Sequence, residues 1–124
     1  MSLSKILFIV AKSPLGELIA GIAFATFSKL LPVERVKETD RVIAFKHPKP
    51  HWEQHILLVP KKAIRNLTSA TAEDFEYIKE IFVVAAQIAK ENNWDKGNYS
   101  IITNGGHRQE VAQLHFHLAS GKTL

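Results

Sequence analysis

Two histidines stand two residues apart in QLHFHLAS (Gln113–Ser120), close to the last residue of the 124-residue sequence. Successive side chains of a β-strand point to opposite faces, so a strand here would place Gln113, His115 and His117 in one polar row. The apolar residues between and after them, Leu114, Phe116 and Leu118, would anchor the other face in the core. A strand held in this way presents its imidazoles in preset positions.

Two chemistries suit this pair of imidazoles. They lie about 7 Å apart along a strand, and neutral imidazoles so placed could share a zinc ion with a third ligand such as His55. Alternatively, one ring attacks a phosphorus centre while its neighbour orients it or handles the proton. A helical ligand set of His47, His51 and His55 is excluded, because two prolines interrupt that segment.

The composition indicates one globular domain over residues 1–124, with 46% hydrophobic and 23% charged residues. The sequence contains no cysteine. This excludes a disulfide framework, thiolate metal ligands and a cysteine nucleophile, and a cytoplasmic location is the simplest expectation.

The net charge of +4 comes from dispersed basic residues. A nucleic-acid-binding stripe would cluster them with aromatic residues between, so we expect a small anionic substrate and no nucleic acid. The apolar runs at residues 6–11 and 18–27 are too short to span a bilayer, which takes about 20 residues. No membrane partner is therefore expected, although a peripheral contact by the N-terminal segment stays open.

The order of elements predicts an α+β fold with an antiparallel sheet. The turn Ser13–Gly16 begins a predicted helix that reaches about Leu30. A second, long helix follows Thr71, a suitable N-cap, and buries a stripe of Phe75, Ile78, Phe82, Ala85 and Ala89. Strands are expected at residues 33–37, 41–46, 55–60, 98–104 and 111–120.

The segment RQEVAQLHFHLAS resembles the signature of the histidine triad (HIT) superfamily, in which three histidines alternate with apolar residues. The resemblance extends upstream to LLPVERVKETDRVIAFKH, PHWEQHILLVPKKAI and the NGG loop. It covers about residues 22–119 and leaves residues 1–21 as an N-terminal extension. It implies the HIT-like fold, an antiparallel half-barrel sheet with one long and one N-terminal helix.

The HINT-like branch of this family is the most similar, and that likeness implies a homodimer that hydrolyses purine nucleoside phosphoramidates or related nucleoside phosphates without a metal or other cofactor. By motif position, His115 is the nucleophile that forms a nucleotidyl intermediate, His117 contacts the phosphate, and His55 supports the nucleophile. The substrate-binding positions implied by the resemblance are Asn104, Gln109, Gln113, Phe45, Ile22 and His47.

Three residues depart from the family pattern. Gln113 replaces the first histidine of the triad, His47 replaces the ribose-binding aspartate, and Glu110 replaces a small hydroxyl residue beside the phosphate. A carboxylate at that last position would repel a phosphate unless it points away or is protonated. Two alternatives therefore stay open: a catalytically weak nucleotide-binding or regulatory protein, and, as a third reading, a histidine-based zinc site.

Overall fold

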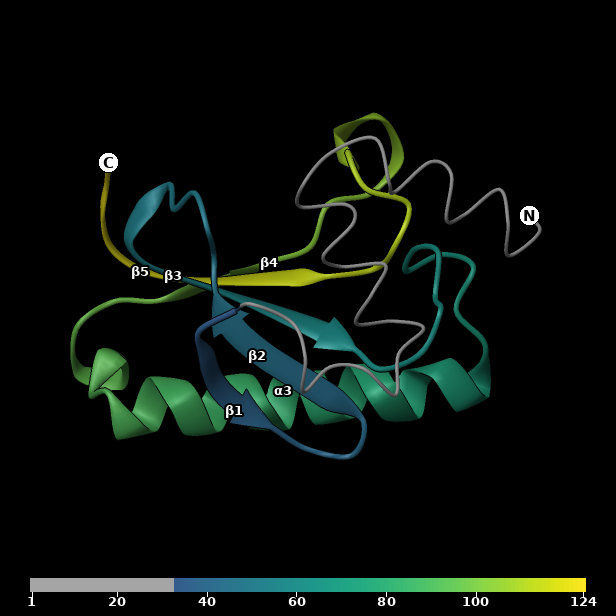
Figure 1. Cartoon of the computed structure of the whole chain (residues 1–124), viewed down its shortest axis with the longest axis horizontal. Coiled ribbons are helices and arrows are strands. Elements are labelled where there is room, and N and C mark those ends of the chain that lie inside the picture. Colours follow the sequence, from purple (N-terminus) through teal and green to yellow (C-terminus); the bar gives the residue numbers. More distant parts are fainter. Residues whose placement is uncertain (1–32) are drawn as a thin grey trace.

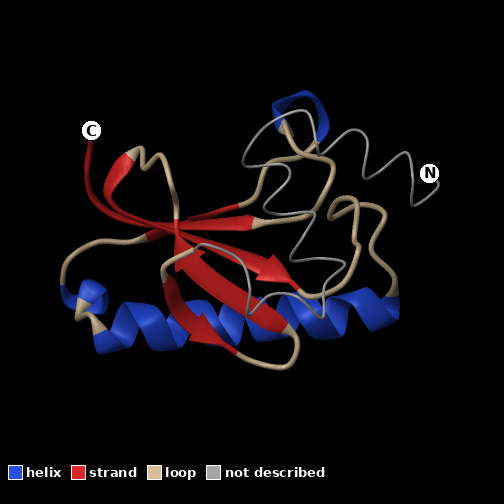
Figure 2. Ribbon diagram, in the orientation of Figure 1, coloured by secondary structure: helices blue, strands red, loops and turns tan. Residues whose placement is uncertain are grey.

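The computed structural model describes residues 33–124, so the predicted helix at residues 13–30 and Ile22 lie outside the described residues. Five antiparallel strands form one sheet in the order β1-β2-β3-β5-β4. The long helix α3 lies along one face of this sheet (Figures 1 and 2). The elements are β1 (Arg35–Glu38), β2 (Val42–Lys46), β3 (Trp52–Pro60), α3 (Ala72–Glu91), β4 (Ser100–Ile102) and β5 (Phe116–Thr123), with short 3-10 helices at Trp94–Lys96 and Gly106–Arg108.

The helix α3 begins with the predicted cap. The Thr71 hydroxyl accepts from the Asp74 N–H, and the Asp74 carboxylate accepts from the Thr71 N–H, which completes a capping box. The stripe that packs on the sheet is centred on Ile78, Ile81 and Ile88. Phe75 and Phe82 lie at the edge of this stripe and are 47% and 49% exposed, so the prediction that they belong to the core face was wrong.

The central strands alternate between two faces. Toward α3 they contribute Val42, Ala44, Ile56, Leu58, Phe116 and Leu118 to the main core. The register pairs Phe45 with Leu57 and Leu57 with His117, so these three residues share the opposite face. Residues 55–60 are buried throughout, which confirms the prediction of a strand covered on both sides.

The last strand differs from the prediction at both ends. β5 begins at Phe116 rather than Val111 and continues to Thr123. Residues 111–115 form bends and irregular backbone instead, because their polar groups pair with the loop after β3. Among residues 33–124, no helix has the length and apolar character needed to cross a membrane.

Candidate active site

The centre of the site is a hydrogen bond between imidazoles on neighbouring strands. His55 on β3 and His117 on β5 are diagonal neighbours on the face opposite α3. Nε2 of His55 and Nδ1 of His117 are 2.8 Å apart. The sheet register therefore brings together two of the three predicted catalytic histidines.

The direction of this hydrogen bond follows from the backbone. The N–H of His51 donates to Nδ1 of His55 over 3.0 Å. A backbone N–H can only donate, so Nδ1 of His55 carries no proton and, in the neutral ring, Nε2 does. Nε2–H of His55 then donates to Nδ1 of His117, which leaves the remaining proton of His117 on Nε2. We call this series, from the His51 N–H through His55 to His117, the histidine relay.

The third histidine has the opposite tautomer. Nδ1 of His115 is 2.8 Å from the carbonyl oxygen of Gln113, which can only accept, so Nδ1 carries the proton and Nε2 keeps its lone pair. The Thr103 hydroxyl donates to the His115 carbonyl over 2.9 Å and holds the backbone of this residue. The rings of His115 and His117 are 5.1 Å apart. A nucleophilic nitrogen and an N–H donor thus lie in neighbouring rings.

Gln113 does not point outward beside the histidines, and the prediction that it shares their face was wrong. Its side chain is 1% exposed. The Nε2 amide donates to the Lys62 carbonyl over 3.0 Å, and Oε1 accepts from the Ile64 N–H over 3.2 Å. These amide atoms are engaged with backbone, so Gln113 positions the His115 segment rather than binding substrate through them.

The loop that receives Gln113 is itself fixed to the start of α3. The Lys62 ammonium lies 2.6 Å from the Asp74 carboxylate, the same group that forms the capping box. The Ile64 carbonyl accepts from the Leu114 N–H over 2.7 Å. The position of His115 therefore depends on the helix start through a short series of hydrogen bonds.

His47 extends the cluster of rings. Its ring stacks on that of His55 with centroids 4.3 Å apart and an angle of 27° between planes. Its Nδ1 accepts from the Lys49 N–H over 2.9 Å, which leaves Nε2–H as its donor. His47 therefore presents a hydrogen-bond donor where the aspartate of the family pattern would present an acceptor.

Burial keeps these imidazoles neutral. Desolvation lowers the pKa of His47 and of His55 to about 4, and that of His117 to about 3, with neighbouring histidines adding to each shift. Desolvation also lowers the pKa of His115, while its hydrogen bond to Gln113 and the charge of Glu110 oppose the shift. At neutral pH the rings are therefore uncharged, as a nucleophilic imidazole requires.

His47, His55 and His117 also meet a distance requirement for a shared metal ion, because one nitrogen of each lies within 4.8 Å of the others. However, Nδ1 of His47 and Nδ1 of His55 each accept a hydrogen bond from a backbone N–H. A metal ion at Nδ1 would displace that bond, and a metal ion at Nε2 would move the ring proton to Nδ1, where it would oppose the backbone N–H. We interpret the cluster as hydrogen-bonded rather than metal-binding, and the expectation of no metal stays a prediction.

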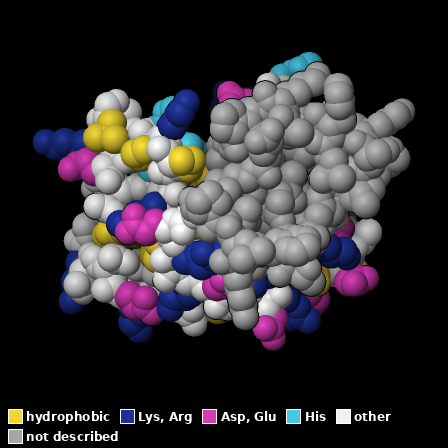
Figure 3. Space-filling model, viewed as in Figure 1, with side chains coloured by type: hydrophobic (Ala, Val, Ile, Leu, Met, Phe, Trp, Pro, Cys, Tyr) yellow, Lys and Arg dark blue, Asp and Glu magenta, His cyan; other side chains and the backbone are white. Residues whose placement is uncertain are grey.

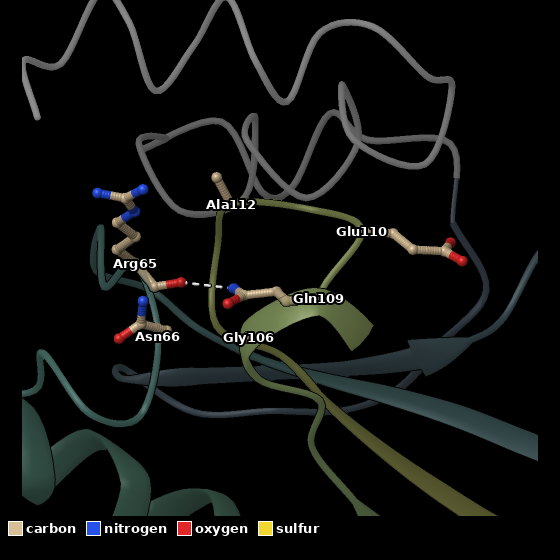
Figure 4. Close-up of a pocket in the computed structure, with 6 residues that line it drawn as sticks. All are labelled: Arg65, Asn66, Gly106, Gln109, Glu110 and Ala112. Atoms are coloured by element: carbon tan, nitrogen blue, oxygen red, sulfur yellow. Dashed lines mark hydrogen bonds between the residues drawn. The ribbon is translucent and has the colours of Figure 1, made fainter.

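A polar pocket of about 260 Å³ opens beside the loop that precedes β5. Arg65, Asn66, Gly106, Gln109, Glu110 and Ala112 line it. Gln109 points toward Arg65 and donates to its carbonyl over 2.7 Å, whereas Glu110 points away from both (Figure 4). Asn104 precedes this loop and is partly exposed.

Two predicted residues are placed differently from the others. Phe45 lies on the histidine face of β2 but is 0% exposed, so contact with a base would require a change in its surroundings. Ile22 lies outside the described residues. Two contributors to the site were not predicted, the Thr103 hydroxyl and the backbone N–H of His51. The backbone donor leaves no signal in the sequence, because any residue type except proline can supply it.

The fold and this arrangement of histidines define the class of the protein. The HIT domain model matches residues 29–124. The chain therefore belongs to the HIT family.

Relatives in this family support the assignment over most of their length. The chain is 33% identical to the purine nucleoside phosphoramidase of Escherichia coli over 106 residues, covering 79% of this chain and 87% of that protein. A histidine triad protein from Clostridium difficile is 37% identical with a TM-score of 0.72, covering 80% and 88% of the two chains. A HIT family hydrolase from Clostridium thermocellum is 31% identical with a TM-score of 0.71, covering 77% and 85%.

Proposed function

We propose that the protein is a hydrolase of purine nucleoside phosphoramidates, or of related nucleoside phosphates, and that His115 is its nucleophile. The observation that carries the proposal is the tautomer of His115. Because Nδ1–H is bonded to the Gln113 carbonyl, the lone pair is on Nε2 beside the His117 ring. The likeness to the Escherichia coli purine nucleoside phosphoramidase supports the choice of substrate.

In the first step the Nε2 lone pair of His115 forms a bond to the α-phosphorus, and the P–N bond of the substrate breaks. The leaving nitrogen takes a proton from solvent and departs as an amine. The His115 ring then carries positive charge, which its hydrogen bond from Nδ1 to the Gln113 carbonyl stabilises. In the second step water attacks phosphorus and gives up a proton to solvent, the P–Nε2 bond breaks with its electron pair returning to the neutral His115 ring, and the nucleoside monophosphate leaves.

His117 serves as a fixed donor in this scheme. Its Nε2–H is directed by the bond between His55 and His117, so it can donate to a phosphate oxygen without a change of tautomer. A donor held in advance stabilises the charge that develops on the transferring phosphoryl group. Asn104 and Gln109 remain proposed phosphate-contacting residues, and His47, Phe45 and Ile22 remain proposed contacts of the nucleoside.

The dispersed charge of the molecule fits a small anionic substrate. Figure 3 shows basic and acidic side chains interspersed over the described part of the side of the molecule that is in view. Such a surface provides local positive charge without a basic stripe along that face, which a polynucleotide would require.

A nucleotide-binding protein with weak catalysis is the second candidate, and Glu110 favours it. Desolvation lowers the pKa of His115, and the negative charge of Glu110 opposes part of that shift. A carboxylate in that position opposes the approach of a phosphate. Both candidates bind a nucleotide, and only the hydrolase turns over a phosphoramidate at an appreciable rate.

Hydrolysis of an adenosine phosphoramidate, followed by release of AMP, separates these candidates. The wild-type protein should release AMP at least a hundredfold faster than His115→Ala, about the contribution expected of a nucleophile held in place. Equal rates, with AMP still binding by calorimetry, would support the binding protein instead.

We also propose a homodimer. Three large apolar residues of α3 are exposed, Phe75, Phe82 and Val83, with exposed fractions of 47%, 49% and 48%. β4 is the last strand of the sheet order and pairs only with β5 among the described strands. Light scattering after size-exclusion chromatography should give twice the monomer mass, and Phe75→Glu should shift it toward the monomer.

The cytoplasmic location remains part of this proposal and is tested by cell fractionation.

A further inference from the structure

The final residues of β5 extend beyond the core of the sheet and pair with the start of β3. Thr123 is the partner of Trp52 in the sheet register. The N–H of Leu124 donates to the carbonyl oxygen of His51 over 3.0 Å. Residues 121–124, which we call the terminal strand segment, therefore contact the residue from which the histidine relay begins.

The terminal strand segment is held in one position by further polar contacts. The Gly121 N–H donates to Oδ1 of Asn98 over 2.8 Å, and the Lys122 N–H donates to Oε1 of Glu53 over 2.6 Å. Gly121 has a φ of +84°, and a Cβ there would lie 2.8 Å from Oε1 of Glu53. Glycine is thus required both by the backbone conformation and by the close approach of Glu53.

Residue 51 is the point where this support meets the relay. Its carbonyl accepts from Leu124, while its N–H donates to Nδ1 of His55. The side chain of His51 makes neither bond. Fixing the backbone at this residue therefore fixes which nitrogen of His55 is protonated.

The relay has two possible directions, and the His51 N–H selects one of them. If that N–H moved away, His55 could carry its proton on Nδ1 and accept at Nε2 from Nδ1–H of His117. The Nε2 atom of His117 would then present a lone pair rather than a donor to a phosphate oxygen. Reversal of the His55 tautomer thus removes a hydrogen-bond donor from the neighbouring ring of His117.

We propose that the terminal strand segment is a positioning element of the active site, which acts by holding the His51 backbone N–H against His55 and so fixes the donor tautomer of His117. This rests on the proposed function only for its effect on turnover. Its effect on the tautomers can be measured without a substrate.

The test replaces Leu124 in two ways. Leu124→Pro removes the N–H that donates to His51, and Leu124→Ala keeps it. The Leu124 side chain is 73% exposed, so both variants should fold and lose little packing. The tautomers of His55 and His117 are read from long-range ¹H–¹⁵N spectra of the full chain, and turnover is measured on an adenosine phosphoramidate.

We expect one tautomer of His55, protonated at Nε2, in wild type and Leu124→Ala, and a mixture of tautomers in Leu124→Pro. Turnover of Leu124→Pro should fall about three- to tenfold, as for loss of one hydrogen bond, and that of Leu124→Ala should stay within about twofold of wild type. An unchanged His55 tautomer in Leu124→Pro would overturn the proposal. A tautomer change in a protein that never turns over substrate would instead support the positioning role and reject the proposed hydrolase.

Discussion

Nε2 of His55 donates to Nδ1 of His117 over 2.8 Å, and this bond joins two central strands of the sheet across the candidate site. The bond gives His117 a defined tautomer, while the Gln113 carbonyl gives His115 the opposite one. The site therefore places a bare nitrogen and a protonated nitrogen in adjacent rings before any substrate arrives.

His55→Ala should lower kcat/KM about a hundredfold, because His117 loses the donor that fixes its tautomer. His51→Ala is the comparison variant, since it keeps the backbone N–H that donates to His55 and removes only a ring whose centroid lies 5.8 Å from that of His55, so its kcat/KM should stay within about threefold of wild type. Steady-state rates on an adenosine phosphoramidate measure both. Equal losses in the two variants would contradict a specific role for the His55 ring.

Gln113→Ala should destabilise the domain by about 2–4 kcal/mol, because the Lys62 carbonyl and the Ile64 N–H lose their partner in a buried position. Gln113→Glu is the closest control in shape. It keeps an acceptor for Ile64 but places an oxygen against the Lys62 carbonyl, so it should also be destabilised. Urea unfolding measures both variants. A change below about 0.5 kcal/mol in Gln113→Ala would mean that this amide does not hold the loop.

The free energy of unfolding should decrease as the pH falls below 6.5, which is the ordinary pKa of a histidine side chain. The unfolded chain takes up protons there, while His47 and His55 in the folded chain stay neutral until about pH 4 and His117 until about pH 3. More protons bound to the unfolded state means lower stability at lower pH, and the decrease should level off near those values.

Urea midpoints at pH 7 and pH 4.5, compared between wild type and His47→Asn, measure this pH dependence. The variant has one desolvated imidazole fewer, so its decrease should be smaller. Parallel curves for the two proteins would show that burial of His47 does not oppose its protonation.

Glu110→Gln should raise the affinity for AMP severalfold, because it removes a negative charge that acts on the proposed nucleophile His115. It should also move the acid limb of kcat/KM to lower pH, since the Glu110 charge raises the pKa of His115. Calorimetry and a pH–rate profile test the two effects. An unchanged profile would place the carboxylate too far from His115 to influence it.

Much of the site could be predicted from sequence because strand alternation is a local property. The alternation in Phe116–Leu118 placed His117 opposite the core correctly, and Thr71 was correctly identified as the helix cap. The short strands were also found, with ends that differ by a few residues. Local backbone preference and apolar spacing decide these features.

The remaining features depend on contacts between distant segments. Gln113 lies in a strand-like pattern, yet its amide pairs with the backbone of Lys62 and Ile64 and so turns inward. The relay depends on His51 and Leu124, which contribute backbone groups that no residue type encodes. Phe75 and Phe82 fit the helical spacing, but the sheet contacts a neighbouring stripe of α3.

The central claim is that His115 forms a covalent nucleotidyl intermediate. The most direct measurement is a mass spectrum of the protein mixed briefly with an adenosine phosphoramidate and quenched, beside His115→Ala treated in the same way. We expect an added nucleotidyl mass on the wild-type protein alone, on the peptide that contains His115. An adduct on both proteins, or AMP released by the wild type with no adduct at any mixing time, would contradict it.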